Sequence, residues 1–115
     1  MNAKEMLKIA YEALDDKKGE ELRIIDISQI SVMADYFLIA SGGSTTQVQA
    51  LVDNVEEKLA EKKVHAKRIE GNRTSGWVLM DYGDIVVHVF DRENRLFYDL
   101  ERIWSDGKEV EISQL

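Results

Sequence analysis

The residues of this chain that are most able to do chemistry are two histidines and a glycine-serine turn. His65 and His88 are the only histidines, and the chain has no cysteine. A catalytic triad needs a nucleophile and an orienting group beside the histidine, and a structural zinc site needs several histidine or cysteine ligands. Neither histidine has a serine nucleophile set beside it in the sequence. We therefore expect no catalytic residue, no metal site and no cofactor.

The segment Gly42 to Thr46 is the candidate for anion or nucleotide binding, because backbone N–H groups at a helix start can hold a phosphate. It lacks the length and the lysine of a Walker loop. A nucleotidyltransferase also needs paired acidic residues on the following strand, which offers only Glu70. We prefer a helix cap, since Ser44 and Gln47 have capping-box spacing. A nucleotide-binding or nucleotidyltransferase-like enzyme that uses this turn is the alternative.

A β-hairpin around Gly83 is the most informative stretch. Its two strands alternate between an aliphatic face and a mixed face. The aliphatic face, which should meet the core, consists of Val78, Met80, Ile85, Val87 and Val89. The mixed face consists of Trp77, Leu79, Val86, His88 and Phe90. A sheet face of this kind is either covered by a helix or serves as a binding surface.

Two turn geometries compete in this hairpin. A two-residue turn at Tyr82–Gly83 places Trp77 opposite His88. A three-residue turn with a glycine bulge shifts the pairing by one residue. We favour the first, because it keeps the polar side chains of His88 and Asp81 out of the core. Both geometries need a left-handed residue near Gly83, which should have positive φ.

The elements that must position these residues follow from periodicity. Apolar residues at helical spacing predict a helix over about four turns from residue 3 and a second helix after Ser44. Strands are expected over 21–27, 35–41, 64–70, 77–82 and 85–90. The predicted fold is a single α/β domain, with a mixed sheet of about five strands and flanking helices.

The C-terminal part should contain one more helix and a tail. Asp91 can cap a final helix, and four apolar residues should share one of its faces: Leu96, Leu100, Ile103 and Trp104. Residues 105–115 are acidic and lack periodicity. We therefore divide the chain into a domain over residues 1–104 and a loose acidic tail over residues 105–115.

Composition restricts the classes of partner. The chain has 115 residues and a net charge of −7. Proteins that grip phosphates need a basic face, so we expect little direct nucleic-acid binding, while an acidic surface favours a basic partner. No apolar run is long enough to span a membrane, and the first residues resemble neither a signal peptide nor a transit peptide. A cytoplasmic protein is expected.

Three stretches of the chain together form a specific sequence pattern. The first is DYFLIASG at 35–42 with STTQV at 44–48. The second is Glu70–Gly71 with GWVLMDYGDIVVHVF at 76–90, and the third is RLFYDLERIW at 95–104. In this order the stretches resemble the RsfS/Iojap family of ribosomal silencing factors, and the resemblance extends over nearly the whole chain.

The resemblance implies a fold related to nucleotidyltransferases but without their catalytic residues. It implies binding to the large ribosomal subunit through ribosomal protein L-fourteen, which blocks subunit joining and lowers translation, and also a role in large-subunit assembly. It further implies that Trp104 packs in the core and that the partner contacts are Trp77, Leu79, Asp81, His88, Phe90 and Tyr98. The oligomeric state stays open, a homodimer included.

Overall fold

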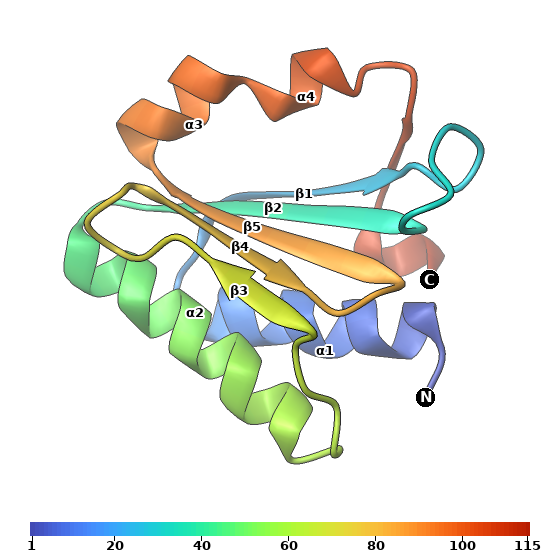
Figure 1. Ribbon diagram of the computed structural model, residues 1–115, viewed down its shortest axis with the longest axis horizontal. Helices are drawn as coiled ribbons and strands as arrows, with labels where there is room; N and C mark the ends of the chain where they lie inside the picture. The colour runs from blue at the N-terminus through green and yellow to red at the C-terminus, as the bar shows by residue number, and fades with distance from the viewer.

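The central sheet separates two pairs of helices that come from different parts of the chain (Figure 1). The computed structural model describes all residues, 1–115. Helices α1 (Ala3–Asp16) and α2 (Thr45–Ala60) lie on one face of the sheet. Helices α3 (Arg92–Tyr98) and α4 (Leu100–Ile103) lie over the other face. No helix has both the length and the apolar character needed to cross a bilayer.

The sheet has six strands in the order β3-β4-β5-β2-β1-β6. In chain order the strands are β1 (Glu20–Asp26), β2 (Tyr36–Gly42), β3 (Arg68–Glu70), β4 (Trp77–Asp81), β5 (Ile85–Asp91) and β6 (Lys108–Val110). Strands β2 and β5 are parallel, and all other neighbours are antiparallel. The prediction of one α/β domain with a mixed sheet is confirmed, and β6 is the strand that it lacked.

The larger hydrophobic core lies between the sheet and the helices α1 and α2. From α1 it receives Met6, Leu7, Ala10, Ala13 and Leu14, which recur at helical spacing. From the hairpin it receives the whole aliphatic face: Val78, Met80, Ile85, Val87 and Val89. Fully burying one large aliphatic side chain stabilises a fold by roughly 1.5–3 kcal/mol, so this layer dominates the stability of the domain.

A smaller hydrophobic cluster lies on the opposite face, under α3 and α4. Its buried members are Ile25, Ile27, Ala34, Ile39, Phe90 and Leu100. Phe37, Trp77, Val86 and Trp104 are partly buried against it. The mixed face of the hairpin is therefore partly covered by helices, and Trp104 packs at the margin of this second cluster.

The predicted hairpin register is wrong. Trp77 pairs with Phe90 and not with His88, which lies opposite Leu79. The turn consists of Gly83 and Asp84, since Tyr82 N–H donates to the carbonyl of Ile85 at 3.0 Å. The physical reason is local: Asp81 Oδ1 accepts the Gly83 N–H at 2.8 Å, which favours a turn beginning at Gly83. Gly83 has φ +87, so the prediction of a left-handed residue there is confirmed.

The prediction of a loose C-terminal tail is wrong for most of residues 105–115. Strand β6 pairs antiparallel with β1, and a 3₁₀ turn follows at Ile112–Gln114. Val110, Ile112 and Leu115 pack against the larger core. A strand of three residues carries too little alternation to be recognised from sequence, so the acidic composition concealed its role.

Candidate functional site

The structure brings most of the predicted contact residues together on the α3–α4 side of the sheet. Trp77 and Leu79 project from β4, with Phe90 and His88 as their cross-strand partners on β5. Tyr98, at the end of α3, lies over Trp77 with ring centroids 4.5 Å apart. Asp81 shares this face through the alternation of β4, but it lies at the far end of the strand from Trp77.

The aromatic rings form a continuous series, which we call the aromatic row. It starts at Trp104 of the α4 end, crosses the sheet and ends on α3, in the order Trp104, Phe37, His88, Trp77, Tyr98 and Phe97. Successive ring centroids lie 4.5–5.9 Å apart. Phe90 stacks beneath Trp77 at 5.0 Å. Such offset and edge contacts add to the free energy of burial and restrict ring rotation.

Burial divides the predicted contact residues into two groups. His88 is 3 % exposed and Phe90 is 0 % exposed, so neither offers its side chain to a partner in this structure. Trp77 and Leu79 are half-buried, and Tyr98 is 39 % exposed. Direct contact with a partner stays a prediction for all six residues. In this structure the side chains of His88 and Phe90 are covered.

The two carboxylate oxygens of Asp81 contact different parts of the protein. Its Oδ1 accepts the backbone N–H of Gly83, and its Oδ2 lies 3.4 Å from Nε of Arg68 on β3. The carboxylate thus supports both the hairpin turn and the β3–β4 edge. It remains half-exposed, so these bonds do not prevent contact with a partner.

His88 is the buried polar residue of the aromatic row. Its Nδ1 accepts a hydrogen bond from the Trp77 indole Nε1–H at 3.1 Å. Its Nε2 is buried and has no hydrogen-bond partner. Burial lowers the pKa of His88 to about 4, because the charged imidazolium would lose its hydration. The ring is therefore neutral at physiological pH.

The helices α3 and α4 add exposed apolar residues that sequence reasoning missed. Leu96 and Phe97 on α3 are 80 % and 77 % exposed, and Ile103 on α4 is 63 % exposed. The predicted helix placed Leu96 and Ile103 on one face with Leu100. Asp99 instead has φ +48 and separates the two helices, so only Leu100 is buried. A left-handed aspartate between two helical stretches gives no strong sequence signal.

A buried arginine holds α3 against the sheet. Arg95 is 5 % exposed, and its Nη1 donates to the Glu20 carbonyl and to the Ser41 hydroxyl, both at 3.2 Å. Its Nη2 also pairs with the Glu101 carboxylate at 3.2 Å. At the other end, Asp91 caps α3 as predicted, its Oδ1 accepting the Asn94 N–H at 2.8 Å. These bonds fix the helix that carries Phe97 and Tyr98.

The glycine-serine turn is closed by its own side chains. Ser44 Oγ accepts the Gln47 N–H at 3.1 Å, and Gln47 Oε1 accepts the Gly43 N–H at 2.6 Å. The Gln47 amide also donates to the Lys18 carbonyl at 2.9 Å, which ties α2 to the end of α1. The predicted cap is confirmed. Two of the backbone N–H groups at this helix start, those of Gly43 and Gln47, are therefore already bonded within the turn. No group of three or more potential metal-ligating residues exists.

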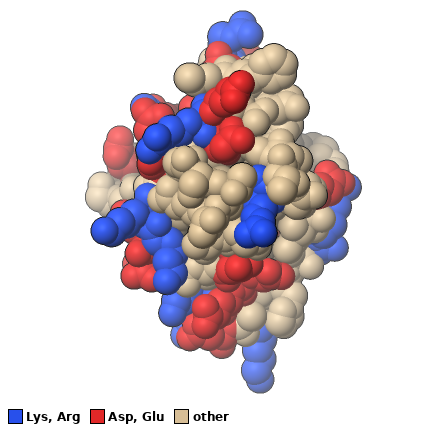
Figure 2. All heavy atoms as spheres, turned by 90° about the vertical axis from the view of Figure 1, so that its left-hand side faces the viewer, with Lys and Arg blue, Asp and Glu red and all other residues tan.

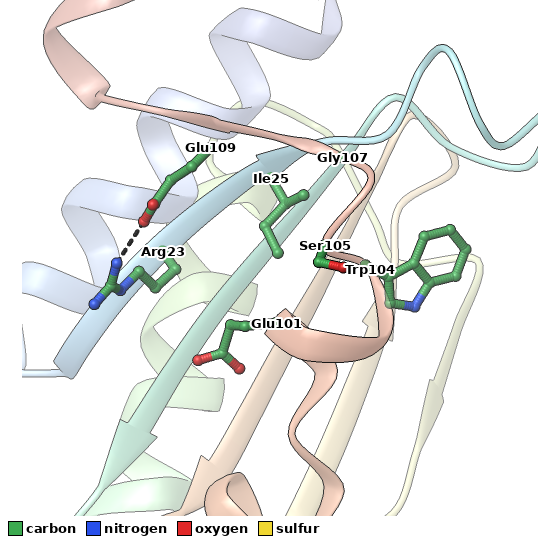
Figure 3. A pocket seen from close by; sticks show the side chains of 7 residues that line it. All are labelled: Arg23, Ile25, Glu101, Trp104, Ser105, Gly107 and Glu109. Carbon is green, nitrogen blue, oxygen red and sulfur yellow. Dashed lines mark hydrogen bonds and ion pairs between the residues drawn. The ribbon is translucent and has the colours of Figure 1, made fainter.

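A pocket of about 300 Å³ lies between α4 and the β1–β6 edge (Figure 3). Its lining combines charged and apolar residues: Arg23, Ile25, Glu101, Trp104, Ser105, Gly107 and Glu109. Arg23 pairs with Glu109 at 2.6 Å, and Glu101 is held by Arg95. The charged groups that line the pocket are thus engaged in ion pairs within the protein, and Ser105 forms no side-chain hydrogen bond to Glu101 or Glu109.

The surface around α3 has no large area of one charge sign. Figure 2 shows mostly uncharged residues in the middle of one side of the molecule, with a basic side chain among them, a group of acidic side chains below and charges of both signs at the left. Beside Trp77 and Leu79 a shallow hollow of about 210 Å³ is also lined by Glu70 and Gly71. An apolar centre with a charged rim is the composition of protein-binding surfaces. The arrangement is suited to binding.

Comparison with known proteins finds relatives that match nearly the whole chain. The family model "Ribosomal silencing factor during starvation" matches residues 1–115. A Bacillus subtilis (strain 168) protein named ribosomal silencing factor RsfS is 45 % identical over 107 residues, covering 93 % of this chain and 91 % of that protein. The chloroplastic protein Iojap of Arabidopsis thaliana is 30 % identical over 111 residues, which cover 96 % of this chain and 44 % of that protein.

A solved structure supports the fold independently. The crystal structure of a Chromobacterium violaceum protein superposes with a TM-score of 0.88 at 39 % sequence identity. The superposition covers 91 % of this chain and 88 % of that one. Over the part that superposes, the fold of this chain is therefore already known from a crystal structure.

Proposed function

The chain belongs to the ribosomal silencing factor (RsfS) family, and we propose that it binds the large ribosomal subunit through ribosomal protein L-fourteen and thereby blocks joining of the small subunit. The proposed site is the exposed part of the aromatic row with its apolar neighbours on α3. We call this set the docking surface: Trp77, Leu79, Leu96, Phe97 and Tyr98. In this proposal the protein is a cytoplasmic repressor of translation and not an enzyme.

The observation that carries the proposal is the exposure of large apolar side chains beside a rigid aromatic row. Phe97 and Leu96 project into solvent, while Trp77 and Tyr98 are supported from below by Phe90. Protein interfaces concentrate their free energy in a few aromatic anchors surrounded by weaker contacts. A monomeric surface rarely gathers such residues without a partner.

Charge supports a basic partner. The net charge of −7 would favour encounter with a basic ribosomal protein and speed association. The same charge disfavours direct phosphate contacts, so the proposed site engages protein and makes little contact with RNA. Blocking would be steric, because a body of 33 × 33 × 26 Å on the subunit-joining surface occupies the space of the small subunit. A role in large-subunit assembly is compatible with the same contact.

Co-sedimentation with separated large subunits tests the docking surface. Trp77→Ala and Phe97→Ala should each weaken binding by about thirty-fold, since loss of an anchor costs on the order of 2 kcal/mol. Met33→Ala is the matched control, because Met33 is 80 % exposed but lies on the β1–β2 loop, outside the docking surface. Circular dichroism verifies that each variant is folded.

Two results decide between the proposal and its alternatives. If folded Trp77→Ala and Phe97→Ala bind large subunits as tightly as the parent does, the docking surface is not the binding site. Equal losses in Met33→Ala and in these variants would show that exposed apolar residues act non-specifically. Binding of the parent protein to purified ribosomal protein L-fourteen identifies the partner directly, and failure to bind it would redirect the proposal to another subunit component.

A further inference from the structure

The hydrogen bond between Trp77 and His88 can have only one direction. An indole Nε1–H donates and cannot accept, so Nδ1 of His88, 3.1 Å away, must be the acceptor. The proton of the neutral ring is then on Nε2. A doubly protonated imidazole would point an N–H at the indole N–H and abolish the contact. The bond therefore requires the neutral form of His88 in a single tautomer.

The other ring nitrogen of His88, Nε2, is left without a hydrogen bond by this arrangement. Nε2 is buried and has no hydrogen-bond partner in the protein. An unpaired buried donor costs free energy, and an aliphatic side chain of similar shape would avoid that cost. The only polar contact made by the imidazole is with Trp77. Stability alone thus gives little reason for a histidine at this position.

Packing fixes the imidazole more firmly than the indole. Phe37 meets the His88 ring edge-on with centroids 4.7 Å apart, and Phe90 stacks parallel to it at 6.3 Å. His88 is 3 % exposed, whereas Trp77 is half-buried at the margin of the cluster. The more deeply buried imidazole can therefore orient the more accessible indole.

We propose that His88 is a positioning residue, whose neutral Nδ1 holds the Trp77 indole in the orientation that the partner meets. The inference rests on the proposed function, in which Trp77 is an anchor of the docking surface. An anchor held in its bound rotamer before association loses less conformational entropy on binding. His88 would act entirely from beneath the surface, without touching the partner.

Two variants of nearly equal shape isolate the acceptor. In His88→Asn the amide Oδ1 lies two bonds from Cβ, as Nδ1 does in histidine, so it can accept the indole N–H. In His88→Leu the side chain has a similar outline but no acceptor. Leucine is the better residue for an apolar environment, so His88→Leu should be the more stable of the two in urea unfolding.

Binding to separated large subunits should follow the opposite order. His88→Asn should stay within about two-fold of the parent, while His88→Leu should bind about five- to ten-fold more weakly, as expected for one lost hydrogen bond and a freed anchor. A residue that only supports the fold would give binding losses that follow stability. Equal affinities of both variants, or an equal loss in both while folded, would overturn the positioning role.

A spectroscopic measurement separates this inference from the proposed function. In ¹⁵N-labelled protein the Trp77 indole N–H should exchange slowly with solvent in the parent and in His88→Asn, and at least ten-fold faster in His88→Leu. The Trp104 indole is the internal control. If the parent ignores large subunits but keeps this exchange pattern, the proposed function fails and the Trp77–His88 orientation stands. If Trp77 exchanges at one rate in all three proteins, the positioning role fails whatever the subunits bind.

Discussion

The two faces of the β4–β5 hairpin bury residues of different kinds. On the aliphatic face Val78, Val87 and Val89 are simply buried. On the other face His88 is just as deeply buried but keeps two ring nitrogens, of which only one is bonded. Packing alone explains the valines, whereas the histidine needs a further explanation besides packing.

Burial of His88 makes the stability of the fold depend on pH. The pKa of His88 is about 4 in the folded protein and near 6.5 in an exposed histidine, so between these values the unfolded chain binds more protons. The stability that comes from the neutral ring is fully present above about pH 6.5. It is lost as the pH falls toward 4. The parent should lose about 2 kcal/mol of unfolding free energy from this group between pH 7 and pH 5.

Urea unfolding at those two pH values checks this, with His88→Asn as the comparison. The variant should lose about 2 kcal/mol less than the parent over the same interval. His65→Asn, at an exposed histidine, is the matched control and should behave like the parent. Identical pH dependence in the parent and in His88→Asn would show that His88 is not the responsible group.

The division of the hairpin into two faces could be predicted, whereas its register could not. Side chains alternate along a strand, and the true register differs from the favoured one by an even number of positions. Trp77, Leu79 and His88 therefore stayed on the predicted face. Which residues form the turn depended on the bond from Asp81 to the Gly83 N–H, a contact that composition does not reveal.

At the scale of elements, the C-terminal third was the least predictable. A continuous helix from Asp91 was expected to pack Leu96 and Ile103, but the break at Asp99 turns both outward. The long apolar runs of β2 and β5 were recognisable because they are buried on both faces. Short elements that depend on tertiary contacts, such as α4 and β6, lack that signal.

Strand β6 should contribute measurably to stability. A variant that ends at Trp104 loses the pairing with β1, the Arg23–Glu109 ion pair and the packing of Val110 and Ile112. Its unfolding free energy should fall by on the order of 2 kcal/mol, mainly through lost apolar burial. Urea denaturation followed by circular dichroism measures the change.

A pair of point variants serves as the control for that truncation. Ile112→Ala should lower stability because Ile112 packs against the core, while Ser113→Ala on the same turn is exposed and should change little. If the truncated protein is as stable as the parent, residues 105–115 do not contribute to the stability of the fold.

At the scale of the whole molecule, the two helical layers have different tasks. The layer of α1 and α2 closes the larger core. The layer of α3 and α4 is thinner: it buries Phe90 and His88 but leaves Leu96, Phe97 and Tyr98 exposed. The sequence predicted the α/β fold and the family, and it placed Trp77 and Leu79 on the mixed face of the hairpin. The exposed part of α3 emerged only once the covering of the sheet was known.

Subunit joining in a purified system tests directly whether the protein keeps the two ribosomal subunits apart. Large subunits are incubated with the protein, small subunits are added, and the joined fraction is read from a sucrose gradient. The joined fraction should fall as the concentration of the parent protein rises. Folded Phe97→Ala at the same concentration should have little effect, because it lacks an anchor of the docking surface. If the parent protein binds the large subunits but leaves the joined fraction unchanged, the proposed block of subunit joining is wrong.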